Sequence, residues 1–111
     1  MLAAACLGER DRPGPPQVTF TIDDTTVVSS RADTVTGIVM AEDADGLDSL
    51  WVTVGTSEQA TDAGFSRTFS FPYRFILPSG QQPGTHIPMS FRARDVAAFE
   101  TQKDTYVVVI P

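Results

Sequence analysis

The chain has 111 residues, a mass of 12.0 kDa, 41% hydrophobic residues and a formal net charge of −6 at neutral pH. Length and composition are those of one globular domain. The acidic balance argues against a nucleic-acid partner, because a phosphate-binding surface needs clustered Lys and Arg side chains. No apolar run approaches the roughly 20 residues that a membrane-spanning helix requires.

The first 16 residues differ in composition from the rest of the chain. Residues 1–6 are small and apolar and end in Cys6, the only cysteine. This string resembles the truncated end of a bacterial lipoprotein signal, which implies a lipid on Cys6 as the only attachment to a membrane; the alternative is an incidental cysteine in a disordered start. Residues 8–16 are charged and rich in proline, a composition that buries too little surface to fold. We therefore predict a disordered tether over 1–16 and a folded domain over 17–111.

Beyond the tether, apolar side chains recur at every second position between short turn-forming segments, which is the period of a strand with one buried face. The pattern predicts strands at about 18–22, 34–41, 48–55, 67–77, 85–95 and 104–110. Residues 26–28 could continue the first strand or pair at an edge, and part of 56–64 could form a small edge strand. The set predicts an all-β, antiparallel β-sandwich of about seven strands.

Short motifs follow one another in order along these predicted strands. They are Val35-x-Gly37-x-Val39, Asp43-x-Asp45-Gly46-Leu47, Val52-x-Val54, Phe75-x-Leu77-Pro78, Pro83-Gly84, Phe91-x-Ala93-x-Asp95 and Tyr106-x-Val108. Together they resemble the bacterial immunoglobulin-like and cadherin-like domains of envelope proteins, over about residues 17–110. The resemblance implies Greek-key connections and a role as a spacer, adhesion module or ligand-binding platform. Where that family has a Gly-Asn turn this chain has residues 97–100, so we expect a different last hairpin.

An acidic segment at 42–48 is the best candidate for a metal site, because hard carboxylate oxygens at alternating positions suit calcium. The weak calcium candidates are Asp43, Asp45, Asp48 and Asp95, with Asp23 as a further contributor. The spacing does not match a calcium-binding loop, since the position of the closing glutamate falls on Val52. We therefore predict a turn at Asp45-Gly46 whose Asp side chains bond local backbone amides, with no metal and no cofactor.

The chemistry needed for catalysis is not readable in the sequence. His86 is the only histidine and lies on the polar side of its predicted strand. Acid–base catalysis needs a partner set around such a residue, and no nucleophile motif accompanies it. We predict a solvated histidine, no catalytic residues and a protein that is not an enzyme.

A second candidate site comes from apolar residues on the outer side of the strands. If Leu50, Val52 and Val54 point into the core, Trp51 points outward. If Tyr106, Val108 and Ile110 point inward, Val107 and Val109 point outward. In the immunoglobulin-like strand order these two strands flank the 85–95 strand. The predicted partner-binding residues are therefore Trp51, Pro88, Arg92, Arg94, Val107 and Val109.

Tryptophan beside arginine is a composition enriched at binding hot spots. The alternative is that β-branched residues are simply good strand formers and that arginine stems cover Trp51. Pro88 cannot donate a ladder hydrogen bond, so it must precede the pairing or mark a bulge.

Together these observations predict a non-enzymatic module of the bacterial cell envelope, on the outer membrane or the surface, that binds an envelope protein or a glycan, mediates adhesion or acts as a spacer. The alternative is a carbohydrate-binding module in which Trp51 stacks on sugar rings. Exposure of the Trp51 ring and binding to glycans distinguish the two.

Overall fold

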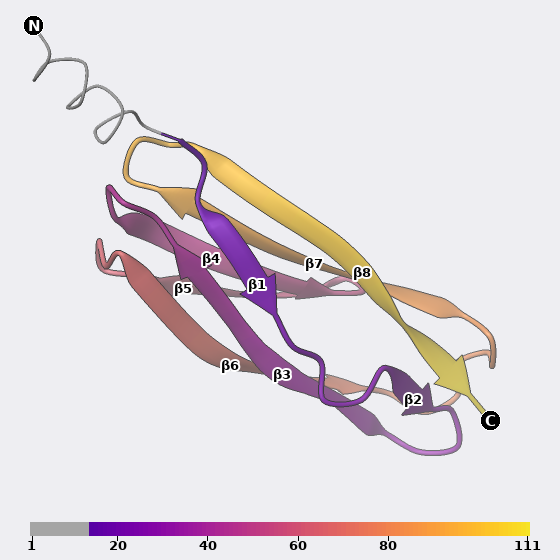
Figure 1. The fold of residues 1–111 in the computed structure, drawn as a ribbon. Helices are drawn as coiled ribbons and strands as arrows, with labels where there is room; N and C mark the ends of the chain where they lie inside the picture. Colours follow the sequence, from indigo (N-terminus) through magenta and orange to yellow (C-terminus); the bar gives the residue numbers. More distant parts are fainter. Residues whose placement is uncertain (1–13) are drawn as a thin grey trace, which may run out of the picture.

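The structure is a computed structural model that describes residues 14–111; residues 1–13, including Cys6, lie outside the described part. Residues 14–111 contain eight strands and no helix, arranged in two facing sheets (Figure 1). The strands are β1 (Gln17–Phe20), β2 (Thr26–Val28), β3 (Asp33–Glu42), β4 (Leu47–Val54), β5 (Ser57–Asp62), β6 (Thr68–Leu77), β7 (His86–Asp95) and β8 (Glu100–Ile110). In this part of the chain no helix is long and apolar enough to cross a membrane.

One sheet has the order β1-β3-β6 and the other the order β2-β8-β7-β4-β5. The chain passes between the sheets after β1, β2, β3, β5 and β6, as in a sandwich. The predicted all-β sandwich is confirmed, and two short edge strands raise the number of strands to eight. The polar segment after β4 forms the edge strand β5, and residues 26–28 pair as β2 with the end of β8. The β2–β8 pair is parallel, unlike the rest of the sandwich.

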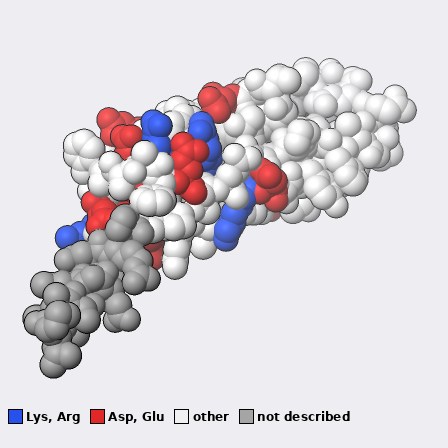
Figure 2. Space-filling model, turned by 90° about the horizontal axis from the view of Figure 1, so that it is seen from above, with Lys and Arg blue, Asp and Glu red and all other residues white. Residues whose placement is uncertain are grey.

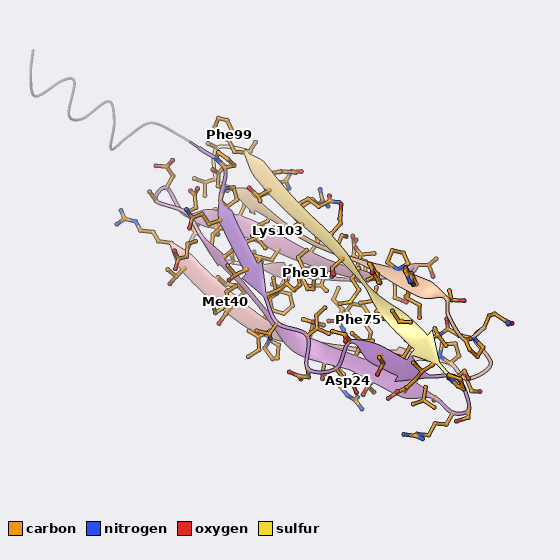
Figure 3. The ribbon with its side chains drawn as sticks, turned by 45° about the vertical axis from the view of Figure 1, so that its right-hand side comes forward. Asp24, Met40, Phe75, Phe91, Phe99 and Lys103 are labelled. Carbon is orange, nitrogen blue, oxygen red and sulfur yellow. The ribbon has the colours of Figure 1, made fainter. Side chains whose placement is uncertain are left out.

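The core lies between the sheets and is built from the alternate side chains that the period predicts. Phe91 on β7 is fully buried, and its ring stacks on Phe20 at a centroid distance of 4.1 Å and meets the edge of Tyr73 at 5.5 Å. Phe75 on β6 is also buried, and both phenylalanines point into the space between the sheets (Figure 3). These aromatic contacts join β1, β6 and β7 across the sandwich.

A hydrogen bond crosses over β3 within the smaller sheet. The Tyr73 hydroxyl on β6 donates to the carbonyl oxygen of Thr21, just after β1, at 2.6 Å. A Cβ atom on Gly37 would collide with both of these groups. Glycine at this position of the Val35-x-Gly37-x-Val39 motif therefore makes room for the hydrogen bond.

The facing of β8 differs from the prediction. Val107 and Val109 are fully buried, whereas Tyr106 is 49% exposed and Ile110 is 37% exposed. The reason is the pairing with β7, in which the buried Ile87 lies opposite Val107. Paired residues of neighbouring strands point to the same face of a sheet, so Val107 faces the core with Ile87. The prediction that Val107 and Val109 belong to an outer binding face was wrong.

Candidate functional site

The outer face of the larger sheet carries four of the six predicted binding residues, namely Trp51, Pro88, Arg92 and Arg94. Its strand register arranges side chains in rows across β5, β4, β7 and β8. The rows are Asp62, Ser49, Arg94, Glu100; then Ala60, Trp51, Arg92, Gln102; then Glu58, Thr53, Ser90, Asp104. Beyond the end of β4 the face continues over β7 and β8 with the pairs Pro88–Tyr106 and His86–Val108. The face therefore changes from charged to uncharged along the strands.

Trp51 points outward from β4 as predicted, but its ring is covered. The Arg92 guanidinium carbon lies 4.0 Å from the ring centroid and that of Arg94 lies 5.3 Å away. In such cation–π contacts the electrons of the indole ring attract the guanidinium group and keep it over the ring. Ion pairs hold the cations in turn: Arg92 with Glu100 at 3.4 Å, and Arg94 Nε with Asp48 Oδ2 at 3.5 Å. The arrangement leaves Trp51 half-buried, with two guanidinium groups close to its ring.

Pro88 lies away from this cluster, near the far end of β7. Its carbonyl oxygen accepts a hydrogen bond of 2.8 Å from the backbone N–H of Gly55, in the turn where β4 has ended. In an antiparallel pair the N–H and C=O of one residue face the same neighbour, so the missing N–H of Pro88 also faces this turn. Pro88 therefore precedes the β4–β7 pairing, the first of the two possibilities that the sequence left open.

Near Pro88 the imidazole of His86 stacks on the Tyr106 ring, with a centroid distance of 4.1 Å and an angle of 4° between the planes. We call the uncharged region at this end the distal patch; it comprises Val28, His86, Pro88, Tyr106, Val108 and Ile110. In Figure 2 the charged side chains gather over the half nearer the grey residues, and the opposite half of the visible face is almost free of them. The sequence analysis missed this patch because it placed Tyr106, Val108 and Ile110 in the core.

The row between the covered tryptophan and the distal patch contains a hollow of about 310 Å³. Its lining residues are Thr53, Gly55, Pro88, Met89, Ser90, Asp104 and Thr105. The hollow exists because the side chains of Thr53 and Ser90 are short and Gly55 has none. On one side stand Trp51 and Arg92, and on the other Pro88 and Tyr106.

The acidic segment forms the predicted turn. Gly46 has a positive φ of 107°, and Asp43 Oδ2 accepts a hydrogen bond from the backbone N–H of Asp45 at 3.0 Å. Three of the candidate carboxylates make separate contacts or face solvent: Asp48 pairs with Arg94, Asp45 is exposed, and Asp23 accepts a hydrogen bond from the Thr36 hydroxyl. Within residues 14–111 no three His, Cys, Asp or Glu side chains come together to hold a metal ion.

Asp95 is the one buried charged residue of the described core, with 1% of its surface exposed. Its Oδ1 atom accepts backbone hydrogen bonds from Ala97 and Phe99, both 2.9 Å long, which shape the last hairpin. Its Oδ2 atom is buried without a partner. The Asp43 carboxyl lies next to it: burial raises the pKa of Asp43, and the neighbouring carboxylates of Asp95 and Asp45 raise it further, against the lowering effect of the Asp45 N–H.

At the same end the tether joins the sandwich. Of the predicted tether the structure describes only residues 14–16, and β1 begins at Gln17. Pro16 is buried, and its carbonyl oxygen accepts a hydrogen bond from the Thr101 hydroxyl near the start of β8. The distal patch lies at the other end of the same strand.

The sequence matches no protein-family model and no curated protein. Solved structures with a similar fold include two from different sources. One is the sporulation control protein Spo0M of Bacillus subtilis, with a TM-score of 0.59 and 12% identity over 88% of this chain and 50% of that chain. The other is the PKD domain of an M14-like peptidase from a Thermoplasmatales archaeon, with a TM-score of 0.54 and 15% identity over 89% of this chain and 96% of that chain. The chain thus spans half the length of Spo0M.

These likenesses establish the fold class. The PKD domain is immunoglobulin-like, so the chain has an immunoglobulin-like β-sandwich fold. Unrelated functions share such folds, and function must be argued from the surfaces described above.

Proposed function

We propose that this protein is a non-enzymatic recognition module of the bacterial cell envelope. In this proposal a lipid on Cys6 anchors the chain, residues 1–16 act as the tether, and the outer face of the larger sheet meets an envelope partner. Protein binding, adhesion and spacing between partners are all compatible with such a module.

The observation that carries the proposal is the separation of the tether from the distal patch. The tether contacts β8 at Thr101, and the patch is centred on Tyr106 and Val108 at the other end of that strand. At about 3.3 Å per residue the two lie roughly 20 Å apart. A chain anchored at its first residues would hold the charged end toward its attachment and present the uncharged end outward.

The chemistry of the face also supports binding rather than catalysis. The guanidinium groups of Arg92 and Arg94 are engaged with Glu100 and Asp48. His86 packs its ring against Tyr106. Exposed aromatic and aliphatic side chains grouped together mark interaction surfaces more often than active sites.

The alternative, sugar stacking on Trp51, is not favoured by the geometry. A sugar ring would have to displace the Arg92 guanidinium from its position 4.0 Å over the indole. It would also break the ion pair between Arg92 and Glu100.

Two measurements test the proposal. The gene should be expressed with its native upstream sequence in its own host, in the presence of a palmitate analogue. We expect label on the wild-type protein in the envelope fraction and none on Cys6→Ser. An unlabelled protein recovered outside the envelope would refute the anchoring.

The second measurement is co-sedimentation of the purified protein with isolated envelopes of the same organism. Tyr106→Arg places a charge in the distal patch and should abolish sedimentation. The matched control is Ile38→Arg, because Ile38 is similarly exposed, at 46%, on the outer face of the smaller sheet. If Tyr106→Arg sedimented with the envelopes as well as Ile38→Arg does, the distal patch would be excluded as the recognition surface.

A further inference from the structure

The hollow between Trp51 and the distal patch carries hydrogen-bonding oxygen groups of two kinds. Thr53 and Ser90 contribute hydroxyls, and Asp104 contributes a carboxylate. A hydroxyl both donates and accepts, whereas a carboxylate only accepts. A ligand that satisfies this set must itself bring several groups that donate and accept, which is the property of a polyhydroxylated molecule.

The carboxylates at both ends of this row are not neutralised by a cation within the described part of the chain. Asp104 Oδ1 accepts from the Gln102 amide at 2.9 Å, and Glu58 Oε2 accepts from the Thr53 hydroxyl at 3.3 Å. The arginines of the next row are paired with Glu100 and Asp48 instead. With a net charge of −6 on the whole chain, this environment repels an anionic ligand and leaves acceptor oxygens available for hydroxyl donors.

An apolar wall borders the hollow on the distal side. Pro88 lines it, and the ring of Tyr106 stands beside Pro88 as its cross-strand partner. Tyr106 is 49% exposed, and the His86 ring stacks on one face of its ring. An aromatic ring held in this way can offer its other face or its edge to the C–H groups of a ligand without losing much side-chain entropy on binding.

From these features we propose that the hollow binds one ring of a neutral saccharide. Asp104, Ser90 and Thr53 would hydrogen-bond the sugar hydroxyls, and Tyr106 with Pro88 would contact the apolar edge of the ring. The volume of about 310 Å³ is at the small end of the range for ligand sites, which suits one ring of a longer glycan. The inference deepens the proposed function, on which it rests, by naming a chemical class for the envelope partner.

The test uses the purified full chain on an array that carries neutral and acidic glycans, followed by titration of the best neutral glycan in a ¹⁵N–¹H NMR experiment. We expect binding to neutral glycans, with the shifted amide signals centred on Ser90 and Asp104. Ser90→Arg fills the hollow and should weaken binding by at least about tenfold. The matched control is Ser70→Arg, the same change on the outer face of the smaller sheet, and it should bind like the wild type.

Asp104→Asn provides a second variant in case Ser90→Arg does not fold, since it keeps the shape and removes the charge. It should weaken binding several-fold with an unchanged melting temperature. Binding to no neutral glycan, binding only to acidic glycans, or binding equally in all variants would each overturn the inference. If the array is blank while Tyr106→Arg still abolishes sedimentation with envelopes, the partner is a protein and the proposed function stands without the saccharide. If the chain binds neutral glycans but carries no lipid label, the saccharide site stands and the proposed lipid anchoring fails.

Discussion

Replacing Asp43 with Asn should stabilise the domain at neutral pH. The Asp95 Oδ2 atom is buried without a hydrogen-bond donor, and the Asp43 carboxyl beside it has no proton to offer when ionised. In Asp43→Asn the amide nitrogen can donate to Asp95 Oδ2 while the amide oxygen still accepts from the Asp45 N–H. One substitution thus removes a carboxylate repulsion and satisfies a buried acceptor.

The magnitude follows from the cost of an unpaired buried polar group, about 1–3 kcal/mol. Asp43 is only half-buried, so solvent screens part of the effect, and we expect a gain near the lower limit, about 1 kcal/mol. For a domain of this size that corresponds to a rise in melting temperature of about 4–8 °C.

The gain should depend on pH in a defined direction. The pKa of Asp43 in the folded protein is raised above its ordinary value of 3.8. The wild-type protein therefore has the full stabilising effect of a protonated Asp43 below pH 3.8 and loses it as the pH rises through the raised pKa. Since Asn mimics the protonated form, the difference between variant and wild type should be full at pH 7 and absent below pH 3.8.

Urea denaturation at pH 7 and at pH 3.5 measures the gain in unfolding free energy and its dependence on pH. Glu42→Gln is the matched control, because Glu42 is exposed next to Asp43, is not among the groups that shift the pKa of Asp43, and gives the same change in net charge. If Asp43→Asn destabilised the protein at pH 7, or if its gain persisted unchanged at pH 3.5, the two carboxyl groups would not interact as described.

Four further predictions test the core, the covered tryptophan and the acidic loop. Phe91→Ala should cost about 3–5 kcal/mol in urea denaturation, since Phe91 is fully buried; a loss below 1 kcal/mol would contradict its central position. Tyr73→Phe should cost about 1–2 kcal/mol of unfolding free energy by leaving the Thr21 carbonyl unpaired. Burial raises the pKa of Tyr73 to about 12, so an absorbance titration of the wild type should show this tyrosine still protonated at pH 11. Arg92→Ala should increase quenching of Trp51 fluorescence by acrylamide, because the guanidinium shields the indole; unchanged quenching would mean that the ring is not covered. Millimolar calcium added after chelation should leave the melting temperature unchanged, and a rise of several degrees would reveal a site.

Much of the fold was predictable because strands with one buried face alternate polar and apolar residues. In β7, for example, the buried Ile87, Met89 and Phe91 alternate with exposed or half-buried side chains. The end of β8 carries no such signal, since residues 106–110 are all apolar and either half of them could face the core. Its facing is decided by hydrogen-bonded register with β7, which is a tertiary property.

The candidate site, like the fold, was predictable from the sequence only in part. Strand order alone placed Trp51 beside Arg92 and Arg94, and the structure bears out that neighbourhood. The stacking of His86 on Tyr106 could not be predicted once Tyr106 was assigned to the core. Asp95 was grouped with Asp43 among the calcium candidates, but their contact arises because the loop between β3 and β4 meets the end of β7, and the spacing of the residues does not set that distance.

The parallel pairing of β2 with β8 bears on how the protein would respond to mechanical load. It joins an early segment of the chain directly to its last strand, with flanking hydrogen bonds from Ser29 to Ile110 and from Val108 to Thr25. Tension on the tether first loads β1, which is paired with β3. Once β1 has separated, the tension pulls β2 backward along its axis, while tension on the C-terminus pulls β8 forward. The bonds between them are then sheared together rather than opened one after another. A module pulled between an anchor and a partner would thus resist extension at this clamp, and its lifetime under force would be set by the rate at which these few bonds fail at once.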